Sequence, residues 1–318
     1  MHDVLYSRHA VSTADGSTVH LGFTSRAAGN LGLHVGDSPA EAVEHRADLE
    51  DALLGSSTAV GFIYLEQVHG TVVCDADQVV AERHTRTGGE DAARQLRSAA
   101  PVADAAVSCD SRALSVMVAD CIPLVFVGEH RVTGSPILGV AHAGRRGLLD
   151  GVIEATVQEL LARSAENIRV WIGPSICGRC YEVPADMHRE SSRLLPEVAS
   201  TTSWGTPALD LPAGAHAVLQ KLPAITEVSD EFSACTLETE QLFSHRAVAH
   251  GREAGRIAGL VWVEKRIDRG HHVDVFRGTC QGVITSSSGG AGTNCCSLSG
   301  FERGACSNFC AARTYGGH

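Results

Sequence analysis

Apolar and polar positions along roughly the first 265 residues form two recurring patterns. Apolar runs bounded by turn residues predict buried strands, and they lie at 59–65, 115–120, 122–127, 136–142, 167–173 and 256–263. After Gly147, apolar residues recur at helical spacing from Leu148 to Leu161, and a second helix is predicted at 212–222, near Asp210. Strands that alternate with helices predict one α/β domain at 1–265.

Two segments depart from these patterns. Residues 80–101 are polar and charged and include Gly88-Gly89, which predicts a surface insertion with some helix. Glycine, serine and cysteine dominate residues 266–318, without a sustained apolar period. We interpret this segment as a disordered tail or the product of a shifted reading frame. A metal-binding appendage is disfavoured, because its five cysteines include no C-x-x-C pair.

Composition limits the partners that we expect. With 44% hydrophobic and 20% charged residues, the 318-residue chain can bury a core. Its formal net charge of −11 disfavours nucleic acid and anionic membranes. The N-terminus does not read as a secretory signal, and no apolar run approaches the roughly 18 residues of a membrane span. We therefore expect a cytoplasmic protein whose 11 cysteines stay reduced unless they bind metal or do chemistry.

Three segments place a metal-binding side chain beside a predicted strand. His69 follows the run at 59–65, Cys121 lies between two runs, and His142 ends the run at 136–142. Strand ends commonly converge on active sites in α/β folds. One cysteine and two histidines match a catalytic zinc shell with its fourth position open. By spacing alone the prediction is weak, because a lone histidine or cysteine is commonly an ordinary polar or core residue.

The sequence resembles a family variously named multicopper polyphenol oxidoreductase laccase-domain proteins, purine nucleoside phosphorylases and peptidoglycan editing factors. The matching segments occur in the family's order, and they are NLGLHVGDSPAEAVEHR (30–46), LEQVHG (65–70), VADCIPLVF (118–126), VAHAGRRG (140–147), IGPSICGRCYEV (172–183), LDLPA (209–213), CTLETEQLFSHR (235–246) and GRIAGLVWV (255–263). The resemblance implies a layered α-β-β-α sandwich with mixed sheets. It also implies that His69, Cys121 and His142 bind zinc, with a purine nucleoside over the metal.

Candidate substrate contacts follow from the same segments. The candidates are Asn30, Arg146 and Arg246 within these segments and Arg26 just before the first of them, and the arginines suit bidentate recognition of phosphate or ribose hydroxyls. Arg146 is the strongest of them, since it follows His142 by four residues on a glycine-rich turn that leads into a helix. The family usually has tryptophan where Arg145 stands here.

Other polar residues in these segments allow two readings. Asp120 beside Cys121 could act as an acid or only bond the turn backbone, and Thr236 is a candidate polar contact in its loop. Cys177 and Cys180 form a C-x-x-C, which can be a redox or zinc motif. We interpret it as a structural loop near the site, as the resemblance implies, and Cys235 as a core residue.

Four functional hypotheses remain at this stage. The first is a Zn²⁺-dependent purine nucleoside phosphorylase that cleaves nucleosides with phosphate and has adenosine deaminase side activity. The second is a laccase-type copper oxidase, in which Cu²⁺ replaces Zn²⁺; the absence of any H-x-H pair among 16 histidines argues against it. The third is a cysteine hydrolase that acts in peptidoglycan editing, with Cys121 as nucleophile and His142 as base. The fourth is a metal-binding protein without activity.

Overall fold

Two β-sheets form the centre of the computed structural model, which describes residues 4–36, 38–55, 60–79 and 89–264. The smaller sheet is antiparallel, in the order β1 (Leu5–Ser12), β2 (Thr18–Thr24), β12 (Ile257–Val263) and β5 (Leu114–Val118). The larger sheet has the order β11 (Ile225–Ser229), β8 (Ala165–Ile172), β6 (Ile122–His130), β7 (Pro136–Ala143), β4 (Ala105–Ser108) and β3 (Val73–Asp75). It is mixed, because β11–β8 and β4–β3 are parallel pairs.

Helices flank the sheets. They are α1 (Pro39–Leu54), α2 (Gly89–Ala99), α3 (Arg145–Asp150), α4 (Val152–Ala162), α5 (Ala185–Leu194), α6 (Leu211–Gln220) and α7 (His245–Val248), with short 3-10 helices η1 (Arg26–Ala28), η2 (Ala76–Gln78) and η3 (Pro196–Val198). A small hairpin pairs β9 (Ala199–Thr201) with β10 (Pro207–Leu209). Within the described residues, no helix is long and apolar enough to cross a bilayer.

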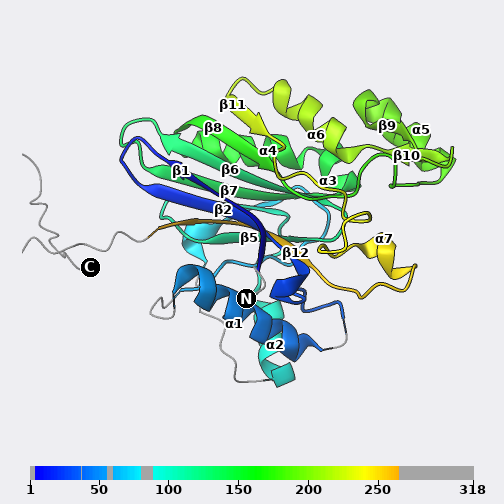
Figure 1. Cartoon of the computed structure of the whole chain (residues 1–318). Coiled ribbons are helices and arrows are strands. Elements are labelled where there is room, and N and C mark those ends of the chain that lie inside the picture. The colour runs from blue at the N-terminus through cyan, green and yellow to red at the C-terminus, as the bar shows by residue number, and fades with distance from the viewer. Residues whose placement is uncertain (1–3, 37, 56–59, 80–88, 265–318) are drawn as a thin grey trace, which may run out of the picture. The chain divides into compact units, whose positions relative to one another are not determined.

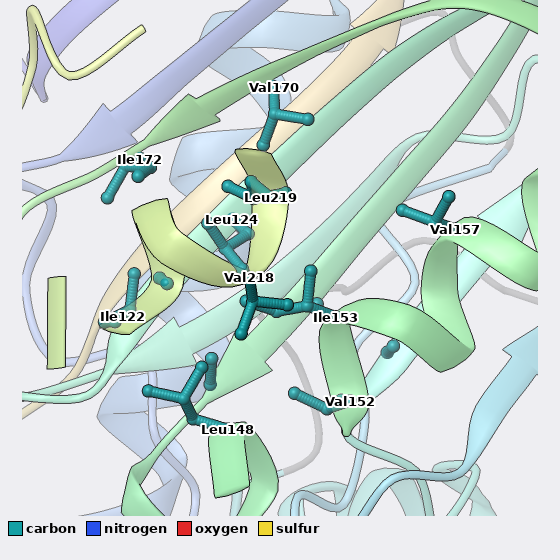
Figure 2. Close-up of a cluster of buried hydrophobic side chains, with 14 of the residues drawn as sticks. Ile122, Leu124, Leu148, Val152, Ile153, Val157, Val170, Ile172, Val218 and Leu219 are labelled. Carbon is teal, nitrogen blue, oxygen red and sulfur yellow. The ribbon is translucent and has the colours of Figure 1, made fainter. Parts of the chain in front are cut away.

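Three apolar layers hold these elements together. The layer between the sheets is fully buried and includes Leu21 and Phe23 from one sheet and Val140 from the other. A second layer lies between the larger sheet and helices α4 and α6, as Figure 2 shows for Leu124, Ile153, Leu219 and their neighbours. A third layer packs α1 against the smaller sheet. Helices therefore lie outside both sheets (Figure 1), and the predicted α-β-β-α sandwich with a mixed sheet is confirmed.

Local signals predicted much of the helix and strand content. The runs at 115–120, 122–127, 136–142, 167–173 and 256–263 correspond to β5, β6, β7, β8 and β12. The helix at 212–222 is α6, and the Asp210 side chain caps it by accepting a hydrogen bond from Ala213 N. The insertion at 80–101 contains α2, while 80–88 lie outside the described residues. The tail predicted at 266–318 also lies outside them.

Two predicted elements are wrong in form. Residues 60–65 are not a regular strand; they make an isolated bridge from Ile63 to Leu114, and Glu50 Oε1 accepts from Phe62 N. The side chains of residues 62–65 are buried in the core, but their backbone is not part of a regular β-ladder. The helix predicted from Leu148 to Leu161 is divided at Gly151, whose φ of 98° ends α3 and begins α4.

Candidate metal centre and its cavity

Cys121 lies where the chain passes from the smaller sheet to the larger one. Residues 119–121 connect β5 to β6, and Asp120 holds a left-handed backbone with φ of 84°. The Asp120 carboxylate is buried and accepts hydrogen bonds from Thr236 Oγ1 at 2.6 Å and from Arg246 N at 2.8 Å. These two bonds favour a backbone conformation that is rare outside glycine. Asp120 therefore fixes the position of Cys121 and attaches it to the loop before α7.

His142 approaches Cys121 from the neighbouring strand. It lies near the end of β7 and pairs with Pro123 of β6, two residues beyond Cys121. Its side chain is buried, and its Nδ1 bonds Asp104 Oδ1 at 2.8 Å. A carboxylate partner at Nδ1 selects the tautomer that leaves Nε2 as the nitrogen able to bind a metal.

Asp104 also positions the second histidine. Its carboxylate accepts backbone hydrogen bonds from Val68 at 3.2 Å, His69 at 2.9 Å and Gly70 at 2.6 Å. These bonds hold a turn in which His69 has a positive φ of 61°. One fully buried carboxylate thus organises both histidines of the candidate site. Asp104 was not predicted from the sequence, because its only signal is an acidic residue directly before an apolar run.

The three side chains converge closely enough to share one ion. Their ligand atoms all lie within 4.8 Å of one another, and Cys121 Sγ is 3.9 Å from His69 Nε2. Ligands of a tetrahedral zinc ion lie about 3.5 Å apart, given bond lengths of about 2.0–2.3 Å. A Cβ at Gly144 would come within 2.8 Å of His69 and 3.0 Å of Cys121. His69 and Cys121 can therefore lie this close to the turn only because Gly144 has no side chain.

The protonation chemistry of the cluster suits a cation. Burial alone raises the pKa of the Cys121 thiol, but the charges and hydrogen bonds of His142 and His69 outweigh it and lower the pKa to about 6. Burial lowers the pKa of His142, yet Cys121 and Asp104 raise it to about 9. A thiolate is the form in which cysteine binds metal, and a metal ion would displace the proton that the raised pKa keeps on His142, so two imidazoles and this thiol fit the donor set of a catalytic zinc site.

A cavity of about 430 Å³ opens over these ligands. This volume lies in the range typical of small-molecule sites. Two guanidinium groups line it, from Arg246 and Arg256, together with the ring of Tyr181. Arg246 stacks on that ring at 4.9 Å from its centroid. The cavity therefore combines a three-ligand cluster, an aromatic surface and two positive charges.

The four predicted substrate contacts occupy different places. Arg246 lines the cavity, whereas Arg26, Asn30 and Arg146 are not among its lining residues. Arg26 pairs with Glu253 at 2.8 Å, and Arg146 is exposed on α3.

Asn30 acts on the cavity through the backbone of other residues. Its Oδ1 accepts from Gly32 N and Arg256 N, and its Nδ2 donates to the carbonyl oxygens of Gly32 and Val35. The loop that carries His34, a cavity residue, is thereby held against Arg256. His34 and Arg256 were not predicted as site residues, although they lie in the matching segments at 30–46 and 255–263.

Comparison with known proteins places this architecture in a family. Residues 8–264 match the family described as multi-copper polyphenol oxidoreductase laccase. The chain belongs to this family. The match includes all three candidate ligands and every described residue that lines the cavity.

Members of the laccase-domain family with curated names resemble the chain over most of its length. A purine nucleoside phosphorylase of Streptomyces griseus is 37% identical, over 81% of this chain and 99% of that protein. One of Streptomyces coelicolor is 35% identical, over 77% and 96%. Among solved structures, YlmD from Geobacillus stearothermophilus is 26% identical with a TM-score of 0.62, over 83% of this chain and 100% of that one. The recognised family and the layered fold are thus both confirmed.

Proposed function

We propose that this chain is a zinc-dependent purine nucleoside phosphorylase that cleaves adenosine, inosine and methylthioadenosine, with adenosine deaminase side activity. The observation that carries the proposal is the cluster of His69, Cys121 and His142 at the base of a cavity that also holds arginine and an aromatic ring. Relatives at 31–37% identity carry the name purine nucleoside phosphorylase. A bound zinc ion would supply a Lewis acid with one coordination position open to substrate.

The residues around the cluster suit a nucleoside and a phosphate together. The Tyr181 ring lines the cavity beside Arg246 and can give a purine an aromatic contact. Arg246 projects from the same wall, and its guanidinium can hold a phosphate by two parallel hydrogen bonds. Arg256 adds a second positive charge. We assign phosphate binding to Arg246 first, and we keep Arg146 as the alternative that sequence favours.

Phosphorolysis requires that an anionic nucleophile be held beside the sugar, and these groups can meet that requirement. A phosphate oxygen forms a bond to the anomeric carbon while the glycosidic C–N bond breaks, and the bonding electron pair leaves with the purine. The positive charges hold the anionic nucleophile in position and favour its approach to the sugar. In deamination, a water oxygen bonds to the purine carbon while the bond from that carbon to the amino group breaks and ammonia leaves, so that reaction needs no phosphate. Asn30 and Arg26 would contribute by holding the surrounding loops, and not by touching substrate.

Product analysis tests the proposal. Zinc-loaded protein is incubated with adenosine, inosine or methylthioadenosine, each with and without phosphate, and the products are identified by chromatography and mass spectrometry. We expect free base and the sugar 1-phosphate only when phosphate is present, and inosine from adenosine without it. The Cys121→Ser variant is the matched control and should form neither product. Absence of phosphate-dependent cleavage would overturn the proposal, and activity that survives full metal removal would indicate that Cys121 is a nucleophile.

A copper-dependent polyphenol oxidase is the second candidate, because the family's description names that activity. The donor set disfavours it. Multicopper oxidases hold several coppers with many histidines, whereas only two candidate ligand groups occur among the described residues, and just one contains histidine. Oxygen consumption by the copper-loaded protein with a phenolic substrate, at a rate above that of the Cys121→Ser variant, would favour this second function.

A further inference from the structure

A second group of ligand side chains lies outside the cluster described above. Three cysteines and one glutamate place their ligand atoms within 4.8 Å of one another. We call this group the sulfur cluster, and its members are Cys177, Cys180, Cys235 and Glu238. The cysteines are buried or partly buried, and the glutamate is exposed.

The fold brings two distant segments together to form the sulfur cluster. An isolated bridge joins Ser175 to Cys235, with hydrogen bonds from Ser175 N to Ala234 O and from Thr236 N to Ser175 O. Two residues after this bridge the chain turns through residues 177–180, where Cys177 O accepts from Cys180 N at 3.0 Å. The turn places both sulfurs of the C-x-x-C pair beside Cys235.

Close packing constrains that turn from its other side. A Cβ at Gly178 would lie 2.6 Å from the Asp210 side chain, so only glycine fits between the two cysteines. Ser200 Oγ also donates to Gly178 O at 3.0 Å. Contacts with Asp210 and Ser200 thus hold the turn in place. The sulfurs of its two cysteines lie beside that of Cys235, and all three cysteines are free thiols.

Hydrogen bonds at the sulfurs add a second indication. The backbone amides of Cys177 and Glu238 donate to the Cys235 sulfur and favour its thiolate.

We propose that the sulfur cluster is a structural metal site that binds one Zn²⁺ ion. Three thiolates and one carboxylate complete a tetrahedral shell without an open position, which distinguishes a structural zinc site from a catalytic one. A C-x-x-C pair from one segment with a third cysteine from another is a common arrangement for such sites. The C-x-x-C, which sequence analysis interpreted as a loop, gains its third thiol only in the folded chain.

The position of the sulfur cluster gives the ion a role. One of its segments continues to Tyr181, and the other continues through Thr236 to Arg246. Tyr181 and Arg246 line the cavity, and Thr236 donates a hydrogen bond to Asp120, beside Cys121. A metal ion would fasten these two loops together some residues away from the reacting groups. It would act by positioning the cavity wall, and not by touching substrate.

Metal stoichiometry tests this inference. The full-length chain with its five tail cysteines at 280, 295, 296, 306 and 310 changed to serine serves as the parent, so that the tail contributes no thiols. The reduced, zinc-loaded parent should hold two ions by native mass spectrometry. Cys121→Ser and the double variant Cys177→Ser/Cys180→Ser should each hold one, and the control Cys74→Ser/Cys109→Ser should hold two. A parent that holds one ion and loses it in Cys121→Ser, or a disulfide within the sulfur cluster in the purified protein, overturns the proposal.

Thiol labelling gives a readout that does not depend on a variant that folds. In the unaltered protein, Cys177, Cys235, Cys74 and Cys109 are all partly buried, so they are matched in access. Metal removal by a chelator should raise the alkylation rate of Cys177 and Cys235 at least tenfold and leave that of Cys74 and Cys109 unchanged. If only Cys121 becomes more reactive, the sulfur cluster holds no metal. That result would leave the first site and the proposed function intact.

Discussion

Asp104 holds both histidines of the candidate site in place, although it is not itself a candidate metal ligand. Its carboxylate accepts a hydrogen bond from His142 and three from the turn that carries His69. We expect Asp104→Asn to weaken zinc affinity about ten- to a hundredfold, because an amide offers a single acceptor atom and points N–H groups at backbone donors. Competition with a chromogenic chelator measures the affinity.

A carboxylate at the other end of β4 provides the control. Asp77 accepts hydrogen bonds from Ser108 Oγ at 2.6 Å, Cys109 N at 2.8 Å and Asp110 N at 3.2 Å, but contacts neither histidine. Asp77→Asn should lower the free energy of unfolding by about 1–3 kcal/mol and leave zinc affinity unchanged. Equal losses of zinc affinity in both variants would mean that Asp104 acts only through general stability.

Arg246 is the residue on which phosphate binding should depend. Its backbone amide bonds Asp120, a contact that alanine keeps, while its guanidinium lines the cavity. Charge-assisted hydrogen bonds contribute about 1.5–3 kcal/mol, so Arg246→Ala should weaken apparent phosphate affinity about ten- to a hundredfold. Deamination of adenosine needs no phosphate and should fall much less.

Arg146→Ala is the comparison, since that side chain is exposed and is not among those that line the cavity. Initial rates over a phosphate series, with zinc content checked in each variant, separate the two arginines. A larger effect at Arg146 would assign the phosphate to the start of α3, as the sequence predicts.

Residues differ in how far the sequence alone could predict them. His69, Cys121, His142 and Arg246 stand in segments that resemble a family, and the structure places all four at one cavity. The hydrogen-bonding roles of Asp104 and of Asp120 depend on partners that lie 34 to 126 positions away in the chain. No local pattern encodes such a partner, so these roles require the folded structure.

At the scale of elements, the break between α3 and α4 decides how the chain leaves the metal site. The apolar spacing from Leu148 to Leu161 continues through Gly151 and predicts one helix, but the backbone at Gly151 is left-handed, with φ 98° and ψ 33°. The spacing of apolar residues shows which residues face the core. It does not show a break between two helices when the apolar face continues across that break.

Gly151→Ala should therefore destabilise the fold, although little lies in the way of the added methyl group. A non-glycine residue in the left-handed region costs about 1–2 kcal/mol, which chemical denaturation can measure. Gly151→Asn is the matched variant, since asparagine tolerates this conformation better, and its loss should be smaller. An alanine variant as stable as the parent would show that the helices can merge without strain.

The run at 59–65 shows the converse limit. Its apolar residues predicted a strand, because a short apolar run occurs both in buried strands and in other buried segments. In the structure, Ile63 bonds the backbone on both sides of Leu114, and the next bridge is at Glu66. The segment passes through the core by isolated contacts, a pattern that depends on its neighbours and not on its own composition.

For the whole molecule, strand order is the feature that the sequence does not encode locally. Strand β12 inserts between β2 and β5, so that Val263 pairs with Val19 and Val261 pairs with Leu114. Each of these strands contributes buried apolar side chains and is compatible with other partners, and only the packing of both sheets selects this order. The resemblance to a family implied the layered architecture, whereas periodicity predicted only its elements.

The candidate metal centre lies at the crossover between the two sheets, so zinc should stabilise the whole domain. An ion that binds only the folded state adds a stabilisation that grows with its concentration, about 2.7 kcal/mol at a hundred times its dissociation constant. For a domain of this size, that corresponds to a rise of about 5–10 °C in melting temperature. Differential scanning calorimetry with and without a chelator measures the shift.

Cys121→Ser isolates the contribution of this site from that of the sulfur cluster. The variant is made in the parent whose five tail cysteines are serine, and it keeps Cys177, Cys180 and Cys235, so the zinc-dependent shift that remains is assigned to the second ion. We expect the shift in Cys121→Ser to be smaller than in the parent, because a serine hydroxyl is a poor replacement for a thiolate ligand. If the parent and Cys121→Ser show equal shifts, the cluster of His69, Cys121 and His142 binds no zinc under these conditions. The ligand assignment, and with it the zinc-dependent mechanism, would then be wrong.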